Sequence, residues 1–107
     1  MAASLARSSL GATAVVAAAD ILAIGAVRGF YDAGLRVPED MSIIGFDDLE
    51  ISQYLAPGLT TIRQQISLKG QRAVELLLEH IADPSLSKQE EILPLKLIER
   101  GSVRKLS

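Results

Sequence analysis

The sequence contains no cysteine, few aromatic residues and no excess of positive charge. The absence of cysteine excludes a disulfide framework and thiol chemistry. Aromatic residues make up 4% of the chain although 49% is apolar, so the core has to be built from Ala, Val, Leu and Ile, which favours helices on a parallel sheet over a β-sandwich. With 11 basic and 13 acidic residues, the formal net charge of -2 argues against a nucleic-acid-binding surface on this segment.

Long apolar runs are also missing, and none approaches the roughly 18 residues that a membrane helix needs. The Ala-rich amino terminus is interrupted by Arg7 and two serines, so it lacks the continuous apolar stretch of a secretory signal. The 107 residues suffice for one ordinary domain with a modest core. We expect the first ten residues to be the last turns of a helix that begins upstream, which indicates truncation.

Strand and helix patterns alternate along the chain, with short connections between them. The expected elements are strand 13–17, helix 20–33, strand 41–46, a short helix at 49–55, strand 60–64, helix 66–82 and strand 95–99. The first two strands are apolar enough to be read as buried. This repeated β-α-β order predicts an α/β fold with a parallel sheet.

The first expected helix has recognisable ends and an apolar face. Asp20 is expected to cap its first turn, and Gly34 followed by Leu35 is typical of a helix C-terminus. Ile24 and Tyr31 form a second apolar strip, which either meets another subunit or widens the buried face. The face expected to pack on the sheet consists of Ala23, Ala26, Val27 and Phe30.

The second long helix is also amphipathic, but the other expected elements offer it no packing partner. Its apolar stripe contains Ala73, Leu77 and Ile81, spaced by four residues, with charged residues on the other side. In the last strand, Leu95, Leu97 and Ile98 are expected to point inward. A helix without a partner is a second indication that the chain is part of a longer protein.

Two aspartates, Asp47 and Asp48, follow the second expected strand directly, where ligands of open α/β sheets bind. A divalent metal would need further carboxylates, and only Glu50 is close in sequence. A phosphoacceptor would need a hydroxyl and a basic residue, as in Thr60, Thr61 and Arg63. A polar ligand needs only one oriented carboxylate and a supporting group such as Gln64. Of the three ligand hypotheses, this one needs the fewest residues beyond those already present in the local sequence. Alternatively, one aspartate only caps the following short helix.

Catalytic signatures are weak. The single histidine, His80, is expected to face solvent on the second long helix, and neither a G-x-S-x-G motif nor a G-x-G-x-x-G motif is present. We therefore expect a protein without catalytic residues, metal or cofactor, although a metal-dependent phosphotransfer domain that uses Asp47 remains an alternative.

Residues 13–102 contain five distinctive stretches: TAVVAAADILAIGA, GLRVPEDMSIIGFDD, YLAPGLTTIRQ, KGQRAVELLLEHI and LPLKLIERGS. Through these stretches, residues 13–102 resemble the carboxy-terminal part of the sensor region of LacI/GalR transcriptional regulators. The resemblance implies an incomplete type I periplasmic-binding-protein-like fold, in which Rossmann-like subdomains hold an effector between them. On this reading residues 1–12 are a lead-in, 13–59 the C-terminal subdomain, 60–83 a crossover strand and helix of the N-terminal subdomain, and 92–102 a return strand.

The resemblance also implies roles for particular residues. Effector contacts map onto Asp47 and onto Gln64, while Ala19 stands where many members carry Asn, so a polar contact is missing there. The helix after AAAD contributes to dimerisation in the family, which assigns interface roles to Ile24, Tyr31 and Leu55.

The implied protein is a cytoplasmic, non-enzymatic homodimer that senses a small sugar-like effector and reaches DNA only through an N-terminal helix-turn-helix absent from this sequence. It has no membrane partner. Two alternatives are the ligand-binding half of a periplasmic-type sugar-binding protein and a non-functional truncated fragment.

Overall fold

The computed structural model describes residues 11–106, so the helix expected within residues 1–10 lies outside the described part. The chain divides into two compact units. The first comprises residues 11–63 and 96–106, and the second is Gln64–Leu95. The second unit is therefore inserted between two separate segments of the first.

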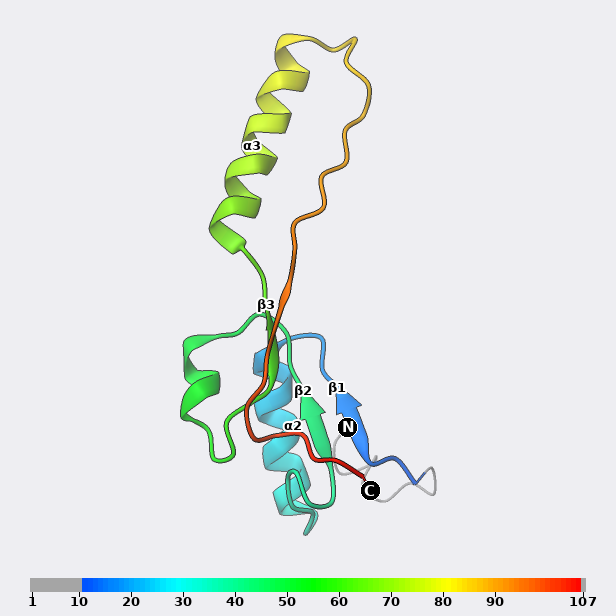
Figure 1. Cartoon of the computed structure of the whole chain (residues 1–107), viewed down its shortest axis with the longest axis vertical. Coiled ribbons are helices and arrows are strands. Elements are labelled where there is room, and N and C mark those ends of the chain that lie inside the picture. Colours follow the sequence, from blue (N-terminus) through cyan, green and yellow to red (C-terminus); the bar gives the residue numbers. More distant parts are fainter. Residues whose placement is uncertain (1–10, 107) are drawn as a thin grey trace. The chain divides into compact units, whose positions relative to one another are not determined.

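The first unit contains four short strands. β1 (Ala14–Val16) and β2 (Ser42–Ile44) pair in parallel, with Val15 opposite Ile43, and lie side by side in Figure 1. A parallel bridge from Ile44 to Thr60 brings β3 (Thr61–Arg63) next to β2, and β4 (Lys96–Ile98) pairs with β3 in the antiparallel sense. The order is thus β1-β2-β3-β4, and the expected strand positions are confirmed.

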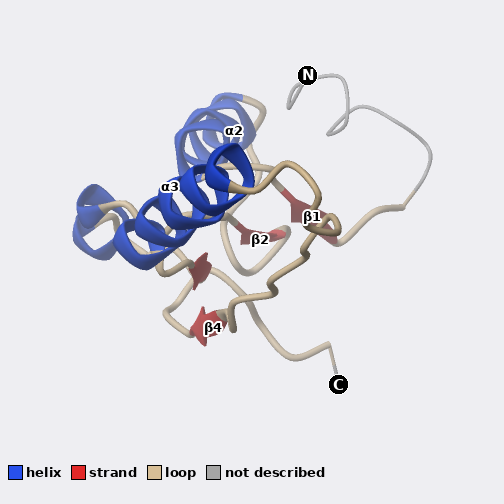
Figure 2. Cartoon of the chain, turned by 90° about the horizontal axis from the view of Figure 1, so that it is seen from above, coloured by secondary structure: helices blue, strands red, loops and turns tan. Residues whose placement is uncertain are grey.

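Helix α2 (Asp20–Asp32) packs on β2 and supplies much of the core (Figure 2). Its inward face is the expected one, because Ala23 and Phe30 are fully buried and Ala26 and Val27 pack against them. The core is completed by residues of the following loop, of β2 and of the β3 approach: Val37, Met41, Ile43 and Leu59.

The end of α2 confirms the glycine signal. Gly34 has φ +81, which costs a glycine little, and its N–H donates to the Tyr31 carbonyl at 3.0 Å. The Leu35 N–H donates to the Phe30 carbonyl at 2.8 Å, and the Leu35 side chain packs against the core. This pair of hydrogen bonds is a Schellman motif.

Two expectations about burial are wrong. β1 was expected to be buried, but Val16 is 77% exposed because α2 covers only the face to which Val15 and Ala17 point. Leu95, just before β4, and Leu97 within it were expected to point inward but are also exposed, and only Ile98 is partly covered. Among the described residues of the first unit, none covers Val16 or Leu97, so these apolar side chains stay exposed there.

The second unit is built around helix α3 (Ile66–Ala82), whose limits agree with the expected helix. None of its residues is buried. Its charged side is ordered by Arg72, which pairs with Glu75 and donates to Glu91 at 2.8 Å. The apolar stripe is left uncovered within the described unit: Val74, Leu77, Leu78 and Ile81 are each more than half exposed. No helix among residues 11–106 is both long and apolar enough to cross a bilayer.

Candidate functional site

The carboxyl ends of the parallel strands meet at one edge of the first unit. The Ala17 N–H donates to the Ile44 carbonyl at 2.8 Å, and the Asp20 N–H donates to the Phe46 carbonyl at 2.8 Å. These bonds tie the β1-α2 connection to the segment that leaves β2. The edge therefore joins the start of α2 to the two aspartates, as the sequence predicts for a ligand-binding edge.

The segment Asp47-Asp48-Leu49, called the aspartate turn below, has an unusual backbone. Asp47 has φ 109 and Asp48 has φ 51, both in the left-handed region that only glycine adopts freely. A residue held there costs about 1–3 kcal/mol and persists only where the surroundings fix it. The Asp47 N–H donates to the Ile62 carbonyl of β3 at 2.9 Å. Strain of this kind is typical of ligand-binding turns.

The two aspartates have different surroundings. Asp48 is 9% exposed, and its two carboxylate oxygens accept hydrogen bonds from Arg63 Nε at 2.8 Å and Arg100 Nη2 at 2.9 Å. Burial alone would raise the pKa of the Asp48 carboxyl, but the hydrogen bonds and charges of the two arginines outweigh it and hold that pKa below its ordinary value. The Asp48 carboxylate therefore binds residues of β3 and of the segment after β4. The Asp47 residue is half-buried.

Asp20 does not cap α2, and this expectation is wrong. The N-cap is Ala19, whose carbonyl accepts hydrogen bonds from the N–H groups of Leu22 and Ala23. The Asp20 side chain is fully buried and turned away from the helix. Its carboxylate finds enough donors in the interior to replace the capping bonds.

The donors around Asp20 come from three parts of the chain. Ser52 Oγ donates to Oδ2 at 2.5 Å, the Leu49 N–H donates to Oδ2 at 2.8 Å, and Thr61 Oγ1 donates to Oδ1 at 2.5 Å. Ser52 lies in the 3-10 helix η1 (Glu50–Tyr54), close to the expected short helix. A Cβ on Gly45 would lie 2.2 Å from Asp20 Oδ1, so the carboxylate occupies the space that a side chain at position 45 would need.

The return segment after β4 closes the site from the other side. The Arg100 N–H donates to Thr60 Oγ1 at 3.0 Å, and Arg100 Nη1 donates to the Leu59 carbonyl at 2.9 Å. The buried Ser102 hydroxyl donates to the Ile43 carbonyl at 2.6 Å and accepts from the Thr60 N–H at 2.8 Å. Ser102 thereby links the middle of β2 to the residue directly before β3.

The predicted effector residues are distributed over both units. Asp47 and Ala19 lie at the same edge of the first unit, joined through the Asp20–Phe46 backbone bond. Gln64 is the first residue of the second unit, directly after β3, and its side-chain oxygen accepts a hydrogen bond from Lys69 Nζ at 3.3 Å. The structure thus groups two of the three predicted residues, and the effector role of all three stays a prediction.

The predicted interface residues differ in exposure. Tyr31 is 45% exposed, whereas Ile24 is half-buried and Leu55 packs against the core. Their role in dimerisation also stays a prediction.

Sequence reasoning missed the supporting residues of the site. Asp20 was assigned to a cap, and Arg100 and Ser102 were not singled out. Asp48 lies in the motif FDD and its partner Arg100 lies in the motif ERGS, but no spacing rule links two residues that are 52 positions apart.

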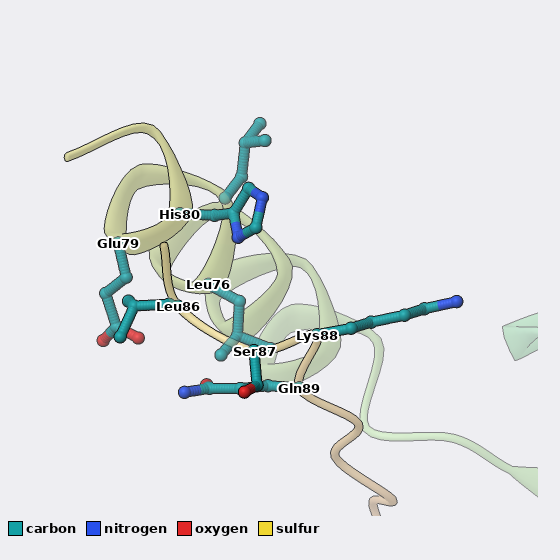
Figure 3. A pocket seen from close by; sticks show the side chains of 8 residues that line it. Leu76, Glu79, His80, Leu86, Ser87, Lys88 and Gln89 are labelled. Atoms are coloured by element: carbon teal, nitrogen blue, oxygen red, sulfur yellow. The ribbon is translucent and has the colours of Figure 1, made fainter. Parts of the chain in front are cut away.

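A hollow of about 410 Å³ lies in the second unit, between the end of α3 and the segment that follows it (Figure 3). Its lining mixes apolar and polar side chains, and the Lys88 side chain extends away from Glu79. His80 lines it and is exposed, as expected from the sequence. None of the predicted effector or interface residues lines this hollow. Among the described residues, no group of three or more His, Cys, Asp or Glu could hold a metal ion.

Comparison with known proteins identifies the family. The periplasmic binding protein-like domain matches residues 2–103. The transcriptional repressor PurR of Aliivibrio salmonicida is 44% identical over 94 residues, which are 88% of this chain and 28% of the relative. The ribose operon repressor of Escherichia coli is 39% identical over 89 residues, 83% of this chain and 27% of the relative.

Solved structures agree. A LacI family transcriptional regulator from Enterococcus faecium with bound ribose is 42% identical, with a TM-score of 0.81 over 99% of this chain and 39% of that one. The lac repressor dimer bound to operator and the anti-inducer ONPF is 35% identical, with a TM-score of 0.82 over 95% of this chain and 35% of that one.

The chain spans about a quarter of the length of these curated relatives, 28% of the first and 27% of the second. The resemblance read from the sequence and the periplasmic-binding-protein-like α/β fold are both confirmed. The chain therefore belongs to the periplasmic binding protein-like domain family, and its matched residues correspond to the sensor region of LacI-type transcriptional regulators.

Proposed function

We propose that the chain is the part of a cytoplasmic LacI-type regulator that senses a small sugar-like effector and contributes to homodimerisation. In this proposal it performs no catalysis. DNA is bound by a separate helix-turn-helix head, because a net charge of -2 argues against a nucleic-acid-binding surface on this segment. Effector binding would act by favouring one arrangement of the sensor over another.

The observation that carries the proposal is the left-handed aspartate turn at the carboxyl edge of the strands. Asp48 is fully engaged by Arg63 and Arg100, so it serves as an anchor. The neighbouring Asp47 is held in a strained conformation and is half-buried at the same edge. An ionised carboxylate that is fixed in this way accepts hydrogen bonds from vicinal hydroxyl groups with good geometry, which is how sugars are gripped.

Related proteins support the class of effector. Two LacI family regulators from Enterococcus were solved with bound ribose, and the regulator CelR was solved as a cellobiose complex. They are 42%, 39% and 30% identical to this chain. A sugar is therefore the first class of ligand to test.

The test is an NMR titration of the isotopically labelled chain with D-ribose and with cellobiose. We expect one of the sugars to shift the amide signals of residues 45–48. Asp47→Asn keeps the side-chain volume but removes the charge, and loss of a charge-assisted hydrogen bond of about 1.5–3 kcal/mol weakens binding by about tenfold or more. Asp32→Asn, an exposed aspartate at the far end of α2, is the matched control and should bind as the unmodified chain does.

Two results would count against the proposal. The first is that both sugars leave the amide signals of residues 45–48 unshifted. The second is that Asp47→Asn binds the sugar as tightly as the control does. Mg²⁺ added alone should leave these signals in place; a shift that disappears in Asp47→Asn would instead favour the metal-dependent phosphotransfer alternative.

Dimerisation through α2 is tested separately by sedimentation. Tyr31 is 45% exposed on the same helix as Ile24, so Tyr31→Glu should lower the fraction of dimer if this strip is an interface. Leu22→Glu is the control, because Leu22 is also an exposed apolar residue of α2 but lies on the other side of the helix from Tyr31. An unchanged dimer fraction in Tyr31→Glu would remove α2 from the interface.

A further inference from the structure

All three backbone N–H groups of the aspartate turn have partners in neighbouring elements. The Asp47 N–H donates to the Ile62 carbonyl at 2.9 Å, the Asp48 N–H to Thr61 Oγ1 at 3.3 Å, and the Leu49 N–H to Asp20 Oδ2 at 2.8 Å. The first partner is backbone, which any residue at position 62 provides. The other two are side chains, so they depend on the identities of Thr61 and Asp20.

Asp20 and Thr61 also fix one another. Both are fully buried, and Thr61 Oγ1 donates its single hydrogen to Asp20 Oδ1 at 2.5 Å. A carboxylate can only accept, so the hydroxyl hydrogen must point toward Asp20. This leaves the Thr61 oxygen lone pairs oriented toward the Asp48 N–H. The buried Asp20 carboxylate thus determines the orientation of the Thr61 hydroxyl. The hydroxyl oxygen in turn accepts the hydrogen bond from the Asp48 N–H of the aspartate turn.

This arrangement explains how two successive non-glycine residues stay in the left-handed region. Such conformations persist where the surroundings over-determine them. Here the two side-chain acceptors hold the N–H groups directly after Asp47, at Asp48 and Leu49, while the Asp48 carboxylate is held separately by Arg63 and Arg100. The conformation of Asp47 is therefore set by residues that lie behind the turn, in the interior.

We propose that Asp20 and Thr61 are positioning residues for effector recognition: they set the conformation of the aspartate turn and thereby aim the Asp47 carboxylate. The inference rests on the proposed function of Asp47 as an effector contact. It assigns to two buried residues a role in binding although neither lies on the ligand side of the turn.

The test compares Thr61→Val with Thr60→Val. Valine is isosteric with threonine and removes only the hydroxyl. Thr60 is the control, because it is nearly as buried and its Oγ1 accepts one backbone N–H, that of Arg100, and none from the aspartate turn. The Arg100 guanidinium pairs with the Asp48 carboxylate. Thr60→Val loses one hydrogen bond, whereas Thr61→Val loses two, one of them to the buried Asp20 carboxylate, so Thr61→Val should be the more destabilised of the two in urea.

Their effects on the turn should differ. In the ligand-free chain, Thr61→Val should change the backbone three-bond couplings of residues 47 and 48 and raise the amide exchange rate of Asp48 by about tenfold or more. It should also weaken D-ribose binding by about tenfold or more. Thr60→Val should leave the couplings and the affinity unchanged, and Thr61→Ser, which keeps the hydroxyl, should restore both.

The proposal is overturned if Thr61→Val keeps the couplings and exchange rate of the unmodified chain, or if Thr60→Val perturbs the turn equally. Should Thr61→Val not fold, Asp20→Asn takes its place, because its amide nitrogen cannot accept the Thr61 hydrogen and the hydroxyl loses its fixed direction. The couplings are measured without sugar. An unmodified chain that binds no sugar, together with changed couplings in Thr61→Val, would therefore refute the proposed function and leave the effect on the turn intact, whereas unchanged couplings in Thr61→Val would refute the positioning role.

Discussion

Replacing Asp20 by alanine is the most severe test of how the first unit is held together. The substitution removes one acceptor group that serves three donors: the hydroxyls of Ser52 and Thr61 and the backbone N–H of Leu49. Both hydroxyl residues are fully buried, so their donors cannot turn to bulk water. Within the described residues no buried side-chain polar atom lacks a partner, and Asp20→Ala would create such atoms.

The magnitude follows from these contacts. A buried donor left without a partner costs about 1–3 kcal/mol. The two buried hydroxyl donors would cost about 2–6 kcal/mol, and the part-buried Leu49 N–H adds less; a water molecule entering the vacated space brings the value toward the lower part of the range, about 3 kcal/mol. A domain of this kind is stable by only about 5–15 kcal/mol. Asp20→Ala should therefore remove a large part of the free energy of unfolding.

Urea unfolding followed by circular dichroism measures the effect. With a denaturant slope of about 1–3 kcal/mol/M, a loss of about 3 kcal/mol lowers the midpoint by about 1–3 M. Asp20→Asn should cost less, about 1–2 kcal/mol, because its oxygen can still accept the Leu49 N–H.

The control is Asp32→Ala on the same helix. Asp32 is exposed and makes only a surface pair with Arg28, so its loss should change stability by no more than about 0.5 kcal/mol. The reasoning is refuted if Asp20→Ala is as stable as Asp32→Ala, or if Asp20→Asn is the more damaging of the two substitutions at position 20.

Three further predictions concern other parts of the chain. Gly45→Ala should lower the free energy of unfolding in urea by about 1–3 kcal/mol, because its Cβ would lie 2.2 Å from Asp20 Oδ1. Gly25→Ala, whose Cβ would meet open space, should raise that free energy by up to about 1 kcal/mol. Equal effects of the two substitutions would contradict the packing argument. Asp48 has a lowered pKa in the folded chain, so its stabilisation is present above the unfolded value of about 3.9 and is lost as the pH falls through the folded value. The stability difference between the unmodified chain and Asp48→Asn should accordingly grow from about pH 2 to about pH 5, and a flat difference would be inconsistent with the arginine pairs. The chain should self-associate and bind a dye for exposed apolar surface through α3, and Leu77→Glu should reduce both relative to Glu79→Gln; a monodisperse monomer without dye binding would show that the stripe is covered.

Local patterns in the sequence were sufficient for the elements and for one face of the core. The spacing of Ala23 and Phe30 identified the buried side of α2, because helical periodicity is a local property. Gly34 identified the helix end for the same reason, since its conformation depends on a few neighbouring residues.

Burial and the supporting network could not be read in this way. Val16 and Leu97 have apolar side chains that are typical of a buried strand, but their exposure depends on whether another layer covers them. The carboxylate of Asp20, at the start of a helix, can accept hydrogen bonds from two kinds of donor: the unpaired N–H groups of the first helical turn, or donors in the protein interior. The choice was decided by Ser52 and Thr61, which are 32 and 41 positions away.

The site itself was predicted in part. The pair Asp47-Asp48 was placed correctly at the carboxyl edge, because parallel strands end on the same side. Which of the two is engaged by arginine was not predictable, since Arg100 reaches Asp48 from 52 positions further along the chain.

The link that Ser102 forms between β2 and Thr60 has a consequence for synthesis on the ribosome. Ser102 is separated from Thr60 by 42 positions, and at about 5–20 residues per second this stretch takes about 2–8 s to translate. During that interval β3 has been made, but the hydroxyl that receives the Thr60 N–H and the arginine that completes the Asp48 pair have not. The first unit can therefore reach its final stability only after the inserted second unit and the return segment have been synthesised.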